Sequence, residues 1–230
     1  RFWLMTEIIE HPYVSTIVPC RNEESFIETC IESLIASTYP KDKLEILIVD
    51  GMSTDRTRDI VEAYVQQYKF VHLFDSQKKI LASAWNIGIQ KSRGEIIMGL
   101  NAHAVFVPQY IPLCVKYLNE YKADYVGGTI RSLPMDATLL GKSIAFAVSH
   151  PFGVGNSFFR IGASEPRWAD TAAFGGFRRE IFDRIGLYNE ELVRSQDIDF
   201  HHRLRKAGGK ILLVPEMVSD YFIRSEFNFS

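Results

Sequence analysis

Cysteine and long apolar runs are both scarce in this chain of 230 residues. The cysteines, Cys20, Cys30 and Cys114, form no Cys-x-x-Cys pair, which predicts buried thiols in a reducing compartment rather than a disulfide framework. No uninterrupted apolar run approaches the ~20 residues that cross a bilayer. The first ten residues lack the basic start, apolar centre and cleavage site of a secretory signal. We therefore expect a soluble, cytoplasmic polypeptide.

An excess of charge of one sign is also missing. The chain has 26 Lys and Arg against 28 Asp and Glu, which gives a formal net charge of −2. Without a basic surplus, non-specific nucleic-acid binding is not expected as the main activity. The 16 Phe, 10 Tyr and 3 Trp residues supply enough apolar surface to exclude disorder over the whole chain. The length suffices for one large domain or two small ones.

Short β-branched runs alternate with amphipathic patterns up to about residue 131. Continuously apolar strands separated by such helices predict a mostly parallel sheet covered on both faces, which is the α/β class. With right-handed crossovers, this becomes a doubly wound, Rossmann-like arrangement. The expected strands are 14–19, 44–50, 70–74, 95–100 and 125–130, and the expected helices are 24–37, 53–68, 82–94 and 108–121.

The remaining residues, 132–230, follow a less regular pattern. Residues 150–170 are rich in Gly, Asn, Ser and Arg and are too long for an ordinary connection, so a functional loop is expected there. We expect one compact unit rather than two separate domains, because no low-complexity linker interrupts the chain. The expected elements are helices 138–149, 179–185 and 196–207 and strands 172–178 and 210–214.

Polar residues follow three of the predicted parallel strands. Ligands of open α/β sheets bind outside the carboxyl ends of the strands, where this sequence places Arg21-Asn22-Glu23, Asp50 to Ser53, and Asn101-Ala102-His103. A structural alternative for Asp50, capping of the next helix, stays open. The first strand is followed by neither Gly-x-Gly-x-x-Gly nor a P-loop motif. This argues against a dinucleotide dehydrogenase, a P-loop ATPase and a nucleotidyltransferase.

Four segments together carry a family resemblance. Residues 18–23 (VPCRNE), 48–57 (IVDGMSTDRT), 175–182 (GGFRREIF) and 196–200 (QDIDF) resemble, in order and spacing, the motifs of family-2 glycosyltransferases. Residues 101–104 and 150–157 are similar to the branch that builds succinoglycan-type exopolysaccharides. The resemblance covers residues 13–224. It implies a GT-A fold and inverting transfer of a sugar, commonly from a UDP-linked donor, to a glycan or lipid-linked acceptor in polysaccharide biosynthesis of the cell envelope.

The resemblance also implies roles for individual residues within one GT-A domain over residues 1–230. Residues 1–131 would form the nucleotide-sugar-binding half and residues 132–230 the acceptor-side half. Asp197 would be the general base that takes the proton of the acceptor hydroxyl; Asp199 is a competing candidate, unless it is only a first-turn helix acid. The expected nucleotide-sugar contacts are Pro19, Arg21, Glu23, Asp50, Ser53 and Asn101, and the expected acceptor-side residues are Asp170, Gly176 and Phe177.

The expected metal site departs from the family pattern. Members of the family usually hold Mg²⁺ or Mn²⁺ with an Asp-x-Asp after the fourth strand, where this chain has Asn101-Ala102-His103. An amide oxygen and an imidazole make a poor Mg²⁺ site and a better Mn²⁺ site. Three possibilities remain open: a weakly bound divalent cation, a metal-independent enzyme, or impaired catalysis. The last gives an alternative function, a nucleotide- or glycan-binding module of the same fold.

Several further residues have both a structural and a functional interpretation. The pair Lys78-Lys79 is expected to be exposed or to meet a diphosphate. His201 and His202 are expected to be solvated or acceptor-side, and Arg203 either forms a surface ion pair or orients Asp197. The loop over residues 150–167 is a candidate lid. Attachment to the cytoplasmic face of a membrane through segments outside this chain, and the oligomeric state, are left open.

Overall fold

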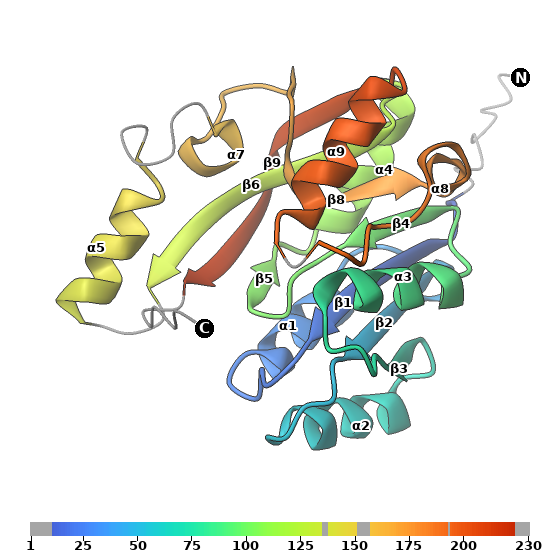
Figure 1. The fold of residues 1–230 in the computed structure, drawn as a ribbon, viewed down its shortest axis with the longest axis vertical. Helices are drawn as coiled ribbons and strands as arrows, with labels where there is room; N and C mark the ends of the chain where they lie inside the picture. Colours follow the sequence, from blue (N-terminus) through green and yellow to red (C-terminus); the bar gives the residue numbers. More distant parts are fainter. Residues whose placement is uncertain (1–10, 135–137, 151–156, 193, 224–230) are drawn as a thin grey trace, which may run out of the picture.

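The structure is a computed structural model that describes residues 11–134, 138–150, 157–192 and 194–223. Within these ranges, nine strands form one sheet in the order β3-β2-β1-β4-β8-β6-β9-β5, and β7 pairs with β9 (Figure 1). The strands are β1 (Val14–Cys20), β2 (Leu44–Asp50), β3 (Val71–Asp75), β4 (Ile96–Gly99), β5 (Ala104–Phe106), β6 (Tyr125–Pro134), β7 (Arg167–Trp168), β8 (Ala173–Arg178) and β9 (Ile211–Ile223).

Helices cover both faces of the sheet. Residues of α1 and α4 belong to one buried apolar cluster, and residues of α3, α8 and α9 belong to a second cluster on the opposite face. The helices are α1 (Ile27–Ile35), α2 (Thr57–Gln67), α3 (Leu81–Lys91), α4 (Tyr110–Glu120), α5 (Leu139–Ala147), α7 (Phe158–Ile161), α8 (Glu180–Ile185) and α9 (Gln196–Lys206), with a short 3-10 turn at Lys41–Lys43.

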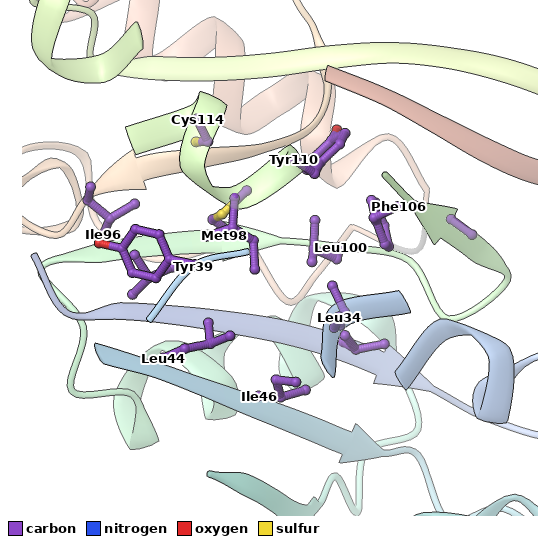
Figure 2. Packing of buried hydrophobic residues seen from close by; sticks show 14 of the residues in the cluster. Leu34, Tyr39, Leu44, Ile46, Ile96, Met98, Leu100, Phe106, Tyr110 and Cys114 are labelled. Carbon is purple, nitrogen blue, oxygen red and sulfur yellow. The ribbon is translucent and has the colours of Figure 1, made fainter. Parts of the chain in front are cut away.

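Strand β1 lies at the centre of the first half and is buried along its whole length. Because successive side chains of a strand point to opposite faces, Val14 and Val18 pack in the cluster with α1 and α4, whereas Ile17 packs against α3. Figure 2 shows the first of these clusters, where Met98 of β4 and Leu100, just after β4, lie between Leu34 of α1 and the α4 side chains. Because both faces of β1 are buried, its sequence is almost continuously apolar instead of alternating with polar residues.

The α/β class is confirmed, and the sheet is parallel where the sequence pattern was regular. Strands β3, β2, β1 and β4 pair in parallel. Strand β8 then lies between β4 and β6 and is antiparallel to both, an order that the strand pattern did not predict. Glycine permits this close packing: a Cβ at Gly176 would lie 2.7 Å from the sulfur of Cys114.

The last two long strands extend further than the sequence pattern predicted. The sequence pattern predicts a final strand over residues 210–214 only. The structure continues β9 to Ile223 through a register shift opposite Gly127 and Thr129 of β6. A Cβ at Gly128 would lie 2.0 Å from the Met217 carbonyl oxygen, so the two strands approach closely at the irregularity. The short strand β5 was also missed, since three residues carry almost no pattern.

Candidate active site

Two neighbouring chambers form one cleft at the carboxyl ends of β1 and β4. The strand-end chamber, of about 470 Å³, is lined by Arg21, Glu23, Gly51, Lys79 and His103 among others. The α9 chamber, of about 290 Å³, includes Asp197 and His201 of α9 with Thr171, Phe177 and Tyr188. Both chambers share four lining residues, which are Pro19, Leu81, Asn101 and Tyr221. The cleft therefore connects the strand ends of the first half with the helix α9 of the second.

The loops after β1 and β2 hold each other in place. The Asn22 backbone N–H donates to Oγ of Ser53 (2.9 Å), and the Thr54 N–H donates to Oδ1 of Asn22 (2.8 Å). The Glu23 N–H donates to Oγ1 of Thr57 (2.7 Å). Asn22 itself has a φ of 54°, a region that asparagine tolerates better than most residues. These bonds fix the rim of the strand-end chamber.

Asp50 lies beneath this rim rather than on its surface. Its carboxylate is 1% exposed and accepts bonds from the Ser53 N–H (3.1 Å) and the Ser53 hydroxyl (2.5 Å). The Arg58 guanidinium lies 3.6 Å away. The capping alternative for Asp50 is wrong, because α2 begins at Thr57, whose N–H donates to Asp55 (3.0 Å). Neither Asp50 nor Ser53 lines the chamber, whereas their neighbour Gly51 does.

Asn101 and His103 belong to the loop after β4. The Asn101 side-chain oxygen accepts the His103 backbone N–H (3.0 Å). The His103 ring lies between two groups: Nε2 is 3.0 Å from the Tyr221 hydroxyl, and Nδ1 is 3.4 Å from a carboxylate oxygen of Glu23. Asn101 lines both chambers and His103 lines the strand-end chamber.

This donor set does not fit a divalent cation held by the protein. In the part of the chain that the structure describes, no three His, Cys, Asp or Glu side chains lie together as a possible metal site. The amide oxygen of Asn101 already accepts a backbone N–H, and His103 Nε2 is engaged by Tyr221. Mg²⁺ prefers six oxygen ligands and Mn²⁺ similar hard donors. The residues present would supply at most a minor share of such a shell.

Asp197 lies in the first turn of α9, at the wall of the α9 chamber. Its side chain is exposed, and within the described ranges no hydrogen bond engages its carboxylate. The neighbouring Gln196 is buried and donates from Nε2 to the Leu192 carbonyl (2.9 Å). The Asp197 carboxylate is thus free to accept a proton from a group inside the chamber.

Two rings, the buried His201 and the half-buried Tyr188, lie beside Asp197. His201 is 5% exposed, so the predicted solvated position is wrong for this residue; its Nδ1 lies 2.7 Å from the Thr171 hydroxyl. Burial lowers the pKa of His201 to about 4, although Asp197 opposes this shift, so the imidazole is neutral near pH 7. Tyr188 stacks on Phe200 with ring centres 4.4 Å apart, and burial with the nearby Asp197 charge raises its pKa.

The other predicted residues are distributed around the cleft. Phe177 lines the α9 chamber. The Cα of Gly176 faces the core, toward Cys114 and Met98, and it is the adjacent Gly175 that lines the chamber. Asp170 lies outside both chambers, where its carboxylate pairs with Arg205 at 2.5 Å.

Asp199, the alternative general base, and Arg203, the candidate to orient Asp197, both have structural partners. Asp199 pairs with Arg203 at 2.9 Å, and Arg203 also donates to the carbonyls of Ile185 and Leu187. Arg203 therefore fixes the turn after α8 and does not orient Asp197. The candidate lid falls partly on residues 151–156, which lie outside the described residues.

Sequence reasoning missed several residues that line the cleft. The signal for the aromatic ones was weak, because Trp85, Tyr125 and Tyr188 fit the apolar faces of their own elements. Lys79 lines the strand-end chamber with a φ of 57°, while Lys78 pairs with Glu190 at 2.6 Å. For this pair, the sequence predicts either exposure or contact with a diphosphate.

Comparison with known proteins identifies the class. Residues 15–186 match the model of glycosyl transferase family 2, and the chain belongs to that family.

Curated relatives agree with this assignment. One is a dolichyl N-acetyl-α-D-glucosaminyl phosphate 3-β-D-2,3-diacetamido-2,3-dideoxy-β-D-glucuronosyltransferase of Methanococcus voltae, 28% identical over 93% of this chain and 68% of the relative. Another is the succinoglycan biosynthesis protein ExoA of Rhizobium meliloti, 29% identical over 91% of this chain and 63% of the relative. The chain thus spans about two thirds of the length of these relatives.

Solved structures confirm the GT-A fold. The S. aureus protein TarS (residues 1–349) in complex with UDP-GlcNAc superposes with a TM-score of 0.71 at 18% identity and covers 92% of this chain and 58% of that one. A mannosyltransferase of Pyrobaculum calidifontis, in complex with GDP-Man and Mn²⁺, gives 0.71 at 22% identity over 95% of this chain and 59% of that one. In the described ranges, no helix has the length and apolar character of a membrane span.

Proposed function

We propose that this domain transfers a sugar, with inversion, from a UDP-linked donor to a hydroxyl of a glycan or lipid-linked acceptor in polysaccharide biosynthesis. The observation that carries the proposal is the continuous cleft from the loops after β1 and β2 to Asp197, since its two chambers share Asn101 and Pro19. Family membership supports a nucleotide-sugar donor. Buried, unpaired thiols at all three cysteines support a cytoplasmic location.

The nucleotide is proposed to occupy the strand-end chamber. Arg21 and Glu23 line it, and the buried Asp50 and Ser53 fix the loop against which the nucleoside would rest. Lys79, at the entrance of α3, offers an ammonium group to the diphosphate. Because the Asn101 and His103 pair is a poor cation site, side-chain cations would offset much of the charge that develops on the leaving UDP, and a divalent cation would add little.

The acceptor is proposed to enter the α9 chamber. As its hydroxyl oxygen forms a bond to the anomeric carbon, the bond from that carbon to the diphosphate oxygen breaks, and the electron pair leaves with UDP. The Asp197 carboxylate takes the hydroxyl proton in the same step. Displacement from the face opposite the leaving group inverts the configuration. Phe177 and Tyr188 supply an apolar wall that excludes water from the reacting centre.

Substitution of Asp197 tests this function. Asp197→Asn should lower transfer of the donor sugar, to acceptor or to water, by about 10²–10⁴-fold, the contribution of a positioned general base. Affinity for UDP should stay unchanged in isothermal titration, because Asp197 lies in the other chamber. Asp199→Asn, two residues along and paired with Arg203, is the matched control and should keep the wild-type rate. A parallel loss of UDP affinity and turnover in Asp197→Asn would assign it a structural role instead.

The engaged amide of Asn101 favours a second candidate function, a nucleotide- or glycan-binding module without catalysis. In that case UDP binds the wild-type domain, but the donor is not turned over at any Mn²⁺ or Mg²⁺ concentration. Asn101→Asp would then gain turnover by restoring an anionic ligand next to His103. Turnover by the wild-type domain excludes this candidate.

A further inference from the structure

A separate hollow adjoins the α9 chamber. This rim hollow, of about 480 Å³, is lined by residues of α7, of β7 and of the segment after β7, among them Phe158, Arg167, Trp168 and Asp170. It shares Phe159 and Thr171 with the α9 chamber. A ligand that projects from Asp197 past these two residues would therefore enter the rim hollow.

Trp168 is the most exposed of the aromatic residues that line the rim hollow. Its side chain is 50% exposed, yet its surroundings hold it in place. The Tyr121 ring meets it edge-on at 6.1 Å between centres, and the Lys210 ammonium lies 5.7 Å from its ring centre. Its backbone pairs with Leu212 of β9. A fixed, exposed indole offers a flat contact surface with little loss of side-chain entropy on binding.

Charged groups flank this indole on both sides along the chain. Arg167 stacks on the Phe158 ring at 3.7 Å, and within the described ranges it has no acidic partner. The Asp170 carboxylate is 84% exposed and is oriented by Arg205 at 2.5 Å. A guanidinium supplies donors and a carboxylate supplies acceptors. Trp168, Arg167 and Asp170 all line the rim hollow, so one ligand there can meet an apolar ring, donors and acceptors. A sugar residue matches this set, because its C–H face is apolar and its hydroxyls both donate and accept.

We propose that Trp168, Arg167 and Asp170 form a subsite for a sugar residue of the acceptor glycan, beyond the residue whose hydroxyl faces Asp197. The inference rests on the proposed function, which places the acceptor in the α9 chamber. The acceptor class that follows is an oligosaccharide rather than a single sugar. A bilayer surface fits less well, because contact with it would desolvate the exposed Asp170 carboxylate and its Arg205 partner.

Indole NMR of the ¹⁵N-labelled domain tests the subsite directly. The probes are cellotetraose, chitotetraose and a hyaluronan tetrasaccharide, so that neutral, acetamido and acidic sugars are all represented. At least one should shift the Trp168 indole signal, and its Kd should rise about tenfold or more in Trp168→Ala, as expected when an aromatic contact is lost. Trp168→Phe should recover much of the affinity. Phe146→Ala, which removes an aromatic ring 69% exposed on α5, is the matched control and should bind as wild type.

Each result bears on the proposal separately from the proposed function, because UDP titration reports the donor chamber in the same samples. Tetrasaccharide binding that depends on Trp168 supports the subsite even if UDP does not bind. Failure of all three tetrasaccharides to perturb Trp168 overturns it, whether or not UDP binds. Loss of binding to phosphatidylcholine–phosphatidylglycerol vesicles in Trp168→Ala, with no tetrasaccharide effect, would reassign Trp168 to a membrane contact.

Discussion

Asp50 combines a structural and a proposed binding role in one buried carboxylate. It holds the turn after β2 by accepting the Ser53 N–H and hydroxyl, and this turn contributes Gly51 to the strand-end chamber. Loss of the carboxylate would leave both Ser53 donors without their partner. The proposed nucleoside pocket and the local fold would therefore depend on the same group.

Asp50→Ala should weaken UDP binding and also lower the free energy of unfolding by about 1–3 kcal/mol, the cost of leaving the partly buried Ser53 donors unsatisfied. Isothermal titration and urea unfolding measure the two effects. Asp59→Ala removes an exposed acid from the neighbouring helix α2 and serves as control. If the folded Asp50→Ala variant bound UDP as tightly as Asp59→Ala, Asp50 would have no part in the nucleotide pocket.

His201 makes stability depend on pH in a predictable direction. Its pKa in the folded protein is about 4, against 6.5 for an unperturbed histidine, mainly because burial disfavours the charged form. Above pH 6.5 the ring is neutral in both states, and the stability is complete. As the pH falls from 6.5 to 4, the unfolded chain takes up a proton that the folded chain does not, so stability is lost.

The loss should reach about 3 kcal/mol near pH 4. Urea unfolding of wild type and His201→Gln across this window gives the comparison, because acidic groups titrate alike in both proteins and cancel in the difference. Wild type should lose more stability than the variant, and the gap should widen steadily below pH 6.5. Parallel curves would show that His201 is accessible to protons in the folded state.

At the scale of elements, Asn86 of α3 links the two halves of the cleft. Its amide nitrogen donates to the Tyr188 carbonyl and to Glu190, and its oxygen accepts the Tyr188 N–H, each at 2.9 Å. Tyr188 in turn stacks on Trp85 of the same helix and on Phe200 of α9. The position of α9, and with it Asp197, is therefore coupled to the helix that lines the strand-end chamber.

Asn86→Asp should break this link, because a carboxylate would face the Tyr188 carbonyl and the Glu190 carboxylate without a proton to donate. We expect a loss of about 2–3 kcal/mol in unfolding free energy and a lower rate of donor turnover. Gln90→Glu makes the same amide-to-acid change at an exposed position of α3 and should stay within about 0.5 kcal/mol of wild type. Equal stability of the two variants would contradict the link.

The elements with the clearest apolar pattern in the sequence were predicted best. Strands β1 and β2 are buried along their whole length and were predicted within a residue, since apolar runs of this kind are unambiguous. The place of β8 between β4 and β6 depends on glycines that let the backbones approach. The order of strands in a sheet has no effect on the periodicity of the sequence, so this order could not be predicted. The continuation of β9 past Pro215 depends on pairing with β6, which no local propensity encodes.

For the whole molecule, the three thiols report on global unfolding. Cys30 and Cys114 are fully buried and Cys20 is 7% exposed, and burial raises the pKa of both Cys30 and Cys114 to about 12. Because the thiolate is the reactive form, all three should resist Ellman's reagent in the native protein and react at once in concentrated guanidinium. A Gln66→Cys variant, exposed on α2, should add one fast-reacting thiol. Fast reaction of a native cysteine would show that its cluster opens locally.

The part of the candidate site that lies at strand ends could be predicted from the sequence. Arg21, Glu23 and Asn101 follow strands whose parallel order brings their carboxyl ends together, and they line the cleft. Asp197 and His201 come from a helix almost a hundred residues further along, and only the family resemblance pointed to Asp197. The burial of His201 could not be foreseen, because it depends on Tyr125 and Phe177 packing around the ring.

The mutual bonding of the loops after β1 and β2 has a consequence for how ligands are recognised. Asn22, Ser53 and Thr54 hold one another's loops by hydrogen bonds. The wall proposed to face the nucleotide therefore has its shape before a ligand binds, and binding need not order a flexible segment. Discrimination among bases would then be of the lock-and-key kind. A change of base preference would therefore require replacing the loops after β1 and β2 together, because a substitution in one of them also removes a hydrogen bond of the other.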